Sequence, residues 1–318
     1  MNRVWIRLTV GLIALAAVAA LIGCEEGLIT PPVKATRQEE ATFTVGESAV
    51  IDADTSNGEV TVCGVEGTQE VHVTVTLRTR GNTQEQADER LDEIVYHVTQ
   101  DGRTIRLQYK ATEQQRDVRR WSGVDFVVSV PVATRVDAET SNGTITVENL
   151  SGRANLDTSN GAITVLTVTG DVVADTSNGR ISMWEVTGDV RADTSNGRID
   201  LERIAGTVRA DTSNGEIELE AITGEVRADT SNGAIHYEGT PVGTANSLRT
   251  SNGAITVRVP TDASIDFEVD AKRGSIRSSL PLVGDTQSDH WEVALNPPAT
   301  ASMSLRTSNG TVRIDRLP

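Results

Sequence analysis

Apolar and polar residues alternate along most of this 318-residue chain, on both sides of a recurring tetrapeptide, Thr-Ser-Asn-Gly (TSNG). Between Thr140 and Thr230 the tetrapeptide recurs every 18 residues, within the pattern G-x-V-x-A-D-T-S-N-G-x-I-x-V-x-x-V. An alternation with a period of two predicts two short, half-buried strands per repeat and excludes a helix. A fixed short period indicates stacked units of similar structure. The copies begin at Thr55, Thr140, Thr158, Thr176, Thr194, Thr212, Thr230, Thr250 and Thr307.

The same apolar residue types recur at the same place in successive repeats. An antiparallel meander, with Asn-Gly as a hairpin turn, would place every apolar residue on one face of a single sheet and leave that face uncovered. A parallel solenoid closes the apolar face on itself and stacks like residues about 4.8 Å apart. We therefore predict an all-β fold, a single-stranded parallel β-helix or β-solenoid with coils of about 18 residues. The clearest column consists of Ile145, Ile163, Ile181, Ile199, Ile217 and Ile235.

We interpret TSNG as the corner of each coil rather than as a ligand motif. Threonine begins the bend, serine and asparagine hydrogen-bond nearby backbone, and glycine with asparagine is expected to supply the left-handed backbone of a tight corner. Stacked asparagines are expected to bond one another from coil to coil. The predicted structural turn residues are Asn57, Gly58, Asn142, Gly143, Asn160, Gly161, Asn178, Gly179, Asn196, Gly197, Asn214, Gly215, Asn232, Gly233, Asn252, Gly253, Asn309 and Gly310.

Residues 41–318 are predicted to form one elongated domain whose two ends differ from its middle. The regular coils extend over about residues 131–260. Before them, about residues 66–130 are expected to form a small α/β excursion with strands and one short helix. We expect this excursion to cap one end of the solenoid, because an open end exposes strand edges and apolar residues. Degenerate coils are expected over residues 261–318.

The first residues of the chain form a targeting segment. Arg3 and Arg7 flank the start of an apolar run that is too short for a transmembrane helix and ends in Leu-Ile-Gly-Cys at Cys24. This ending resembles a bacterial lipobox, which implies removal of residues 1–23 as a signal peptide and acylation of Cys24, with fatty acids such as palmitate. The alternative is an ordinary signal peptide with a chance cysteine. Several acyl chains anchor a protein stably, so we expect a membrane-anchored lipoprotein of the outer membrane or cell surface, with residues 24–40 as a flexible tether.

The chain is strongly acidic. Its formal net charge is −16, and loss of Arg3 and Arg7 with the leader would lower this to −18. Such acidity argues against binding nucleic acid and against lying flat on anionic lipid. Cys63 is the only cysteine besides Cys24, so we expect no intrachain disulfide. The predicted outward columns, in which arginines offset the repulsion between aspartates, are Asp157, Asp175, Asp193, Asp211 and Asp229 beside Arg191, Arg209 and Arg227.

No group of residues in the sequence marks a catalytic or metal site, so we predict no cofactor. Catalysis needs one exceptional place, whereas the aspartate column makes every coil alike. The histidines lack ligand spacing and the Asp-Thr-Ser-Asn-Gly run fails the EF-hand pattern, although weak calcium binding along the aspartates is an alternative to a solvated surface. Cys63 is expected to be an inert thiol. Trp121, Trp184 and Trp291 form no column, which favours isolated packing or surface residues over a sugar-binding stripe.

The lipobox, the segment VDFVVSVPVATRVDAETSNGTITV and the tandem ADTSNGxI coils together resemble the bacterial putative-adhesin family of β-strand-repeat proteins, a domain family of unknown function. The resemblance extends from about residue 41 to the end of the chain. It implies a right-handed β-solenoid on a bacterial surface and supplies no functional residues.

We therefore predict a non-enzymatic, lipid-anchored, adhesin-like surface protein. Its regular acidic face would serve as a scaffold or bind an unknown protein or glycan partner at the cell envelope. Two alternatives remain open, a polysaccharide lyase or hydrolase of the envelope and an envelope-stress or assembly partner.

Overall fold

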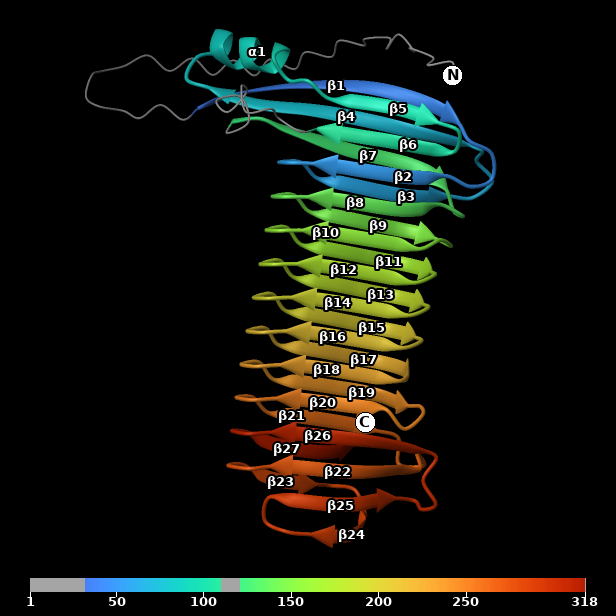
Figure 1. Cartoon of the computed structure of the whole chain (residues 1–318), viewed down its shortest axis with the longest axis vertical. Helices are drawn as coiled ribbons and strands as arrows, with labels where there is room; N and C mark the ends of the chain where they lie inside the picture. Colours follow the sequence, from blue (N-terminus) through green and yellow to red (C-terminus); the bar gives the residue numbers. More distant parts are fainter. Residues whose placement is uncertain (1–31, 110–120, 318) are drawn as a thin grey trace, which may run out of the picture.

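The computed structural model describes residues 32–109 and 121–317. Figure 1 shows them as a long stack of β-strands with one short helix at the N-terminal end. The predicted signal peptide, residues 1–23, and the predicted lipidation site, Cys24, lie outside the described residues. Among the residues that are described, none of the helical structure is long and apolar enough to cross a membrane.

Each regular coil consists of one strand before the TSNG corner and one strand after it. Neighbouring coils pair in parallel with like positions side by side, so Ile163 pairs with both Ile145 and Ile181. The predicted β-solenoid is therefore confirmed, and the alternative of an antiparallel meander is wrong. A sheet of 14 strands, called sheet B here, contains β8 (Arg135–Thr140), β10 (Ala154–Thr158), β12 (Val172–Thr176), β14 (Val190–Thr194), β16 (Val208–Thr212), β18 (Val226–Thr230) and β20 (Asn246–Thr250). A sheet of 13 strands, called sheet A here, contains β9 (Ile145–Leu150), β11 (Ile163–Thr169), β13 (Ile181–Thr187), β15 (Ile199–Ala205), β17 (Ile217–Gly224), β19 (Ile235–Pro241) and β21 (Ile255–Val259).

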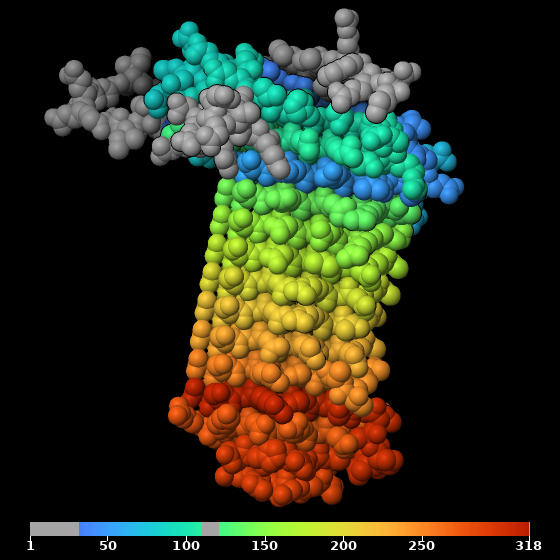
Figure 2. All heavy atoms as spheres, viewed as in Figure 1, coloured from blue at the N-terminus to red at the C-terminus, as the bar shows by residue number. Residues whose placement is uncertain are grey.

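The core is a thin apolar layer between sheets A and B. Within one coil, Ile181 and Val186 of sheet A and Ala192 of sheet B are buried. Full burial of an isoleucine or valine stabilises the fold by roughly 1.5–3 kcal/mol relative to exposure. Because every regular coil buries a similar set, stability accumulates coil by coil. Figure 2 shows the result, a shaft of even width formed by the regular coils.

Hydrogen bonds between neighbouring coils hold the TSNG corners. The buried hydroxyl of Thr158 accepts a bond from the N–H of Gly161 (3.2 Å) and donates to the carbonyl of Gly143 in the preceding coil (3.1 Å). Nδ2 of Asn160 donates to Oδ1 of Asn142 at 2.8 Å. Equivalent bonds of 2.8–2.9 Å join all the corner asparagines into one ladder, so the expected bonding from coil to coil is confirmed. In spatial order the ladder runs through Asn57, Asn142, Asn160, Asn178, Asn196, Asn214, Asn232, Asn252 and Asn309.

The corner glycines are needed for a reason that the sequence did not predict. All nine corner glycines lie within the described residues, and none of them has a positive φ. The predicted left-handed corner is therefore wrong. A Cβ added at Gly161 would lie 1.7 Å from the carbonyl oxygen of Gly143. Glycine is required because the backbones of stacked corners approach one another too closely for any side chain.

Left-handed backbone lies instead near the opposite end of five successive coils. Glu185 has a φ of 55° and interrupts the alternation between the inward residues Met183 and Val186. Gly188 follows with a φ of 149°. This bulge places two successive side chains outward and turns the chain from sheet A toward sheet B. The residues equivalent to Glu185, with φ between 53° and 56°, are Asn149, Thr167, Arg203 and Ala221.

The N-terminal region extends both sheets beyond the first coil. Its antiparallel partners β1 and β4 pair along the whole length of β1, so residues 33–40 form an edge strand. The prediction that these residues belong to a flexible tether is wrong, because β4 supplies hydrogen-bond partners for them. The excursion lies at the end of the stack, as the predicted cap requires (Figure 1). The elements are β1 (Val33–Thr44), β2 (Val50–Thr55), β3 (Val60–Val65), β4 (Glu70–Gly81), α1 (Gln84–Asp92), β5 (His97–Asp101), β6 (Thr104–Tyr109) and β7 (Gly123–Pro131).

The C-terminal coils do not stack in the order of the sequence. Strand β26 lies between β20 and β22, and β27 lies between β21 and β23. The last coil of the chain is therefore inserted between two coils that precede it, while β24 and β25 end sheet B in antiparallel pairing. The elements are β22 (Ile265–Ala271), β23 (Ser275–Ser278), β24 (Val283–Thr286), β25 (His290–Leu295), β26 (Ala301–Thr307) and β27 (Thr311–Arg316).

Candidate functional site

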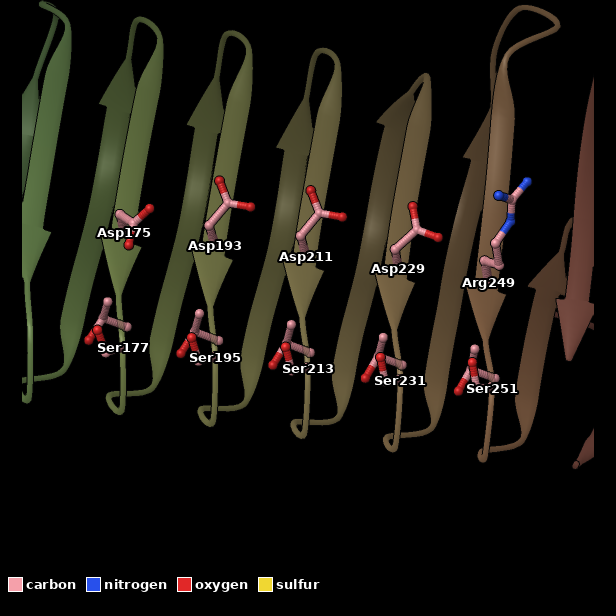
Figure 3. Close-up of a pocket in the computed structure, with 15 residues that line it drawn as sticks. Asp175, Ser177, Asp193, Ser195, Asp211, Ser213, Asp229, Ser231, Arg249 and Ser251 are labelled. Atoms are coloured by element: carbon pink, nitrogen blue, oxygen red, sulfur yellow. The ribbon is translucent and has the colours of Figure 1, made fainter. Parts of the chain in front are cut away.

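The outward face of sheet B carries a shallow groove of about 430 Å³. Parallel pairing places Asp175 beside Asp193, and Asp211 beside Asp229, in one column. Figure 3 shows these carboxylates in a row, with a second row of serines just beyond the ends of the same strands. We call this surface the acidic groove. Its outward side chains are Asp175, Ser177, Asp193, Ser195, Asp211, Ser213, Asp229, Ser231, Arg249 and Ser251.

Two carboxyl groups of the acidic groove, those of Asp193 and Asp229, have a raised pKa. Partial burial raises the pKa of Asp229, and the neighbouring Asp211 raises it further. Burial also raises the pKa of Asp193, although the hydrogen bond and the charge of Arg191 oppose the shift. Carboxylates held one coil apart repel one another because the separation is short compared with the screening length of about 8 Å at physiological salt.

Two arginines offset part of this repulsion. Nε of Arg191 lies 2.6 Å from Oδ2 of Asp193, and Nε of Arg209 lies 2.7 Å from Oδ2 of Asp211. The expected column of arginines beside the aspartates is therefore confirmed at these two coils. Exposed pairs of this kind are worth about 0–1 kcal/mol each. The column is incomplete, since Val173 stands where the next coil has Arg191, so Asp175 lacks an arginine two residues before it.

The arrangement favours binding over covalent chemistry. Four coils of the acidic groove each offer one carboxylate, which accepts hydrogen bonds, and one serine hydroxyl, which donates and accepts them, and the fifth coil offers Arg249 and Ser251. The corner threonines are already used, because the hydroxyl of Thr194 donates to Gly179 and accepts from Gly197. The residues lining the groove include no histidine or cysteine beside the serines. An activated serine needs such a base within hydrogen-bond reach.

The model of the family described as Toastrack DUF4097 matches residues 48–315 of the chain. The chain belongs to the Toastrack family. The match begins just before the first coil and ends within β27, so it includes the acidic groove and the whole corner ladder. The predicted resemblance to an adhesin-like domain of unknown function is thereby confirmed.

Three solved structures are similar to this Toastrack chain. A putative adhesin from Parabacteroides merdae is 11% identical with a TM-score of 0.45, and the match covers 89% of this chain and 96% of that one. A putative adhesin from Bacteroides fragilis is 13% identical with a TM-score of 0.38, covering 88% and 97%. A putative cell adhesion protein from Clostridium sporogenes is 8% identical with a TM-score of 0.24, covering 88% and 100%. The comparison with curated proteins found no match.

The Toastrack fold keeps apart the other residues that the sequence singled out. His236 lies 3.0 Å from Glu216 on sheet A, and His290 lies 2.7 Å from Asp270 at the C-terminal end. Cys63 is a half-buried free thiol in β3. In the part of the chain that the structure describes, no three histidine, cysteine, aspartate or glutamate side chains are grouped as a metal site would require.

Sequence reasoning missed a charged network on sheet A of the Toastrack domain. The guanidinium of Arg198 forms ion pairs with Asp200, Glu216 and Glu218, the second at 3.1 Å. Arg180 of the preceding coil also pairs with Asp200. The partners stand 2, 18 and 20 residues after Arg198, which are the spacings of neighbours within and between coils. Reading opposite charges at these spacings would have predicted the network.

Proposed function

We propose that this Toastrack domain is a non-enzymatic binding module of a bacterial surface and that the acidic groove is its main binding face. The observation that supports the proposal is the uniformity of the groove. The same aspartate recurs in β12, β14, β16 and β18, and the same serine recurs directly after each of these strands, with the side chains outward (Figure 3). A repeated surface suits a partner that is contacted at several coils at once, because weak contacts add when they are linked.

The same uniformity argues against the alternative of a polysaccharide lyase or hydrolase. Such enzymes need two carboxyl groups with separate roles and separate pKa values. In the acidic groove, Asp193 and Asp229 have equivalent places in their coils, and burial raises the pKa of both. The groove is also shallow and open along the stack, and it offers no enclosed place for a distorted sugar ring.

We further propose that a lipid on Cys24 anchors the domain and that the N-terminal end of the stack lies next to the membrane. The first described strand begins at Val33. The nine residues from Cys24 to Val33 can span at most roughly 30 Å, so the anchor would hold β1 close to the lipid surface. The regular coils and the acidic groove would then project away from it. The negative charge of the chain opposes a flat orientation on anionic lipid.

The anchor is tested by labelling growing cells with an alkyne analogue of palmitate. The full chain should incorporate the label, and the variant Cys24→Ser should lose it and leave the membrane fraction. Cys63→Ser is the matched control and should be labelled normally. Labelling that persists in Cys24→Ser would contradict the proposed site of acylation.

The binding face is tested with the purified full chain on immobilised cell-envelope fractions. We expect saturable binding without turnover, and at least a tenfold loss in a variant with Asn in place of Asp175, Asp193, Asp211 and Asp229. The control changes the adjacent Ser177, Ser195, Ser213 and Ser231 to Ala and should lose much less. Unchanged binding by the Asn variant would exclude the groove. Release of sugar products that stops on substitution of one carboxylate would instead support the enzyme alternative.

A further inference from the structure

Sheet A carries a second groove, of about 260 Å³, which lies on the outward face of β13, β15 and β17 and does not include any residue of the acidic groove. Trp184 lies in its wall beside Leu166 of the preceding coil. On its other side the same column continues with Glu202 and Glu220. The groove is therefore apolar and aromatic at one end and acidic at the other. Its volume is just below the roughly 300–1,000 Å³ of sites for drug-sized ligands, which suits a single functional group on a linker.

The indole of Trp184 already holds a cation of this chain. The guanidinium carbon of Arg203 lies 5.2 Å from the centroid of the ring. Nη1 of Arg203 lies 2.9 Å from Oε1 of Glu202. Both side chains of this ion pair are about half exposed, so solvent and other cations reach them. An aromatic face combined with a carboxylate is an arrangement that attracts guanidinium and ammonium groups.

At the acidic end of the groove, Glu220 is the carboxylate that the arginines of the described residues leave without an ion pair. Arg180 and Arg198 are engaged by Asp200 and, for Arg198, also by Glu216 and Glu218. Among the described residues, no lysine, arginine or histidine forms an ion pair with Glu220. Burial raises the pKa of Glu220, and the charge and the hydrogen bond of Glu218 and the charges of Glu202 and Glu238 raise it further. An incoming positive charge would relieve this repulsion.

We propose that the groove at Trp184 binds an arginine side chain of an extended segment of a partner protein, which takes the place of Arg203 on the indole and is held by Glu202 and Glu220. Arg203 then acts as a resident competitor that the partner displaces. Displacement is possible because exposed ion pairs are weak and the groove continues beyond the side chain that now covers the ring. The site lies on the opposite sheet from the acidic groove and does not rest on the function proposed for that groove.

The chain itself supplies matched substitutions for this site. Leu166 stands in the same column as Trp184, so the substitution Trp184→Leu introduces a side chain that the neighbouring coil already accommodates. Asn149 has a φ of 56° at the position equivalent to Arg203, whose φ is 55°, so Arg203→Asn fits the left-handed backbone. Neither change should disturb the coil, and both variants are first checked by circular dichroism and thermal unfolding.

The test is calorimetric titration of the full chain with tetra-arginine amide, with the neutral sugar maltohexaose as the contrasting ligand. We expect Arg203→Asn to bind the peptide about threefold more tightly and Trp184→Leu to bind it about tenfold more weakly. Glu220→Gln should also weaken binding. The control is the double variant Asp193→Asn and Asp211→Asn in the acidic groove. It should leave the affinity of the Trp184 groove for the peptide unchanged.

If Trp184 and Arg203 only stabilised the fold, the two substitutions would change the affinity for the peptide in the same direction. Displacement of Arg203 by the peptide predicts changes in opposite directions. Unchanged or weaker binding by Arg203→Asn would overturn the proposal. Binding of maltohexaose through Trp184 without binding of the peptide would also overturn it, in favour of a glycan site. Loss of peptide binding in the acidic-groove control alone would assign the affinity to that groove instead.

Discussion

Asn142 and Asn160 lie 18 residues apart in the sequence, and Nδ2 of Asn160 donates to Oδ1 of Asn142 over 2.8 Å. The same bond of 2.8 Å joins Asn252 and Asn309, which lie 57 residues apart. The corner asparagines are therefore bonded in the order in which the coils stack, whatever their separation in the sequence. Its amide is engaged by neighbouring coils on both sides, and this leaves the outward faces of the two sheets as the surfaces for partners.

Substitution of one ladder asparagine is expected to lower stability without abolishing binding. Asn196→Ala removes the amide that donates to Asn178 and the oxygen that accepts from Asn214. Two exposed hydrogen bonds are worth about 1–2 kcal/mol in total, and urea unfolding should show this loss. The control Ser195→Ala changes the adjacent exposed side chain and should have little effect. Intact stability together with lost binding to envelope fractions would show that TSNG is a ligand motif.

Alanine at a corner glycine is expected to be more harmful than alanine at a glycine with positive φ. A Cβ at Gly197 would lie 1.7 Å from the carbonyl oxygen of Gly179, whereas one at Gly67 would meet nothing within 4 Å but has a φ of 71°. We expect Gly197→Ala to cost at least about 2 kcal/mol through displaced backbone and Gly67→Ala about 1 kcal/mol through φ alone. Denaturant unfolding measures both. Equal costs would mean that close stacking is not the reason for the glycine.

The corner threonine is expected to stabilise the coil through its hydroxyl. Thr194 accepts from the N–H of Gly197 at 3.1 Å and donates to the carbonyl of Gly179 at 3.2 Å. Thr194→Val keeps the shape but leaves both buried backbone groups without this partner, at a cost of about 1–3 kcal/mol. Thr194→Ser keeps the hydroxyl and should cost less. The reverse order of the two variants in urea unfolding would show that the methyl group matters more than the hydroxyl.

The aspartate column is expected to make stability depend on pH. Burial, and next to it the charge of Asp175, raises the pKa of Asp157 above its ordinary value of 3.8. A carboxyl with a raised pKa in the folded state favours folding when protonated, so its ionised form destabilises the fold at neutral pH. Asp157→Asn should therefore raise the melting temperature at pH 7, and the gain should shrink as the pH falls from the folded pKa toward 3.8.

Asp262→Asn, in an exposed loop, serves as the control for the pH experiment. It should change the melting temperature little, both at pH 7 and at pH 3. A gain in Asp157→Asn that stays the same at pH 7 and at pH 3 would show that the carboxylate charge is not its cause.

The period of the sequence was sufficient to predict the regular coils. Ile145, Ile163 and Ile181 recur at the coil spacing, and parallel stacking is the arrangement that buries such a column on both sides. The reason why position 161 needs glycine could not be predicted from the period. A glycine is compatible both with positive φ and with close approach of two backbones, and only the position of Gly143 decides between them.

The order of the last coils and the groove at Trp184 also escaped sequence analysis. Strand pairing places Thr307 beside Thr250, but nothing in the spacing of these two copies shows that the intervening coil has moved outward. Arg203 reaches Trp184 from the next coil and stands at the left-handed bulge, which the period of the sequence does not indicate. The aspartate column, by contrast, followed directly from the period, because it needs no departure from the regular coil.

All nine corners form one continuous stack, with the last coil inserted out of sequence order. Cysteine cross-linking tests this most directly. Arg249 pairs with Arg306, while Asp270 lies one coil further away, beside Arg306. In a Cys63→Ser background, the pair Arg249→Cys and Arg306→Cys should form a disulfide under mild oxidation, since adjacent strands meet the distance requirement. The pair Arg249→Cys and Asp270→Cys should not. A disulfide in the second pair and none in the first would show that the coils stack in the order of the sequence, and would contradict the ladder described here.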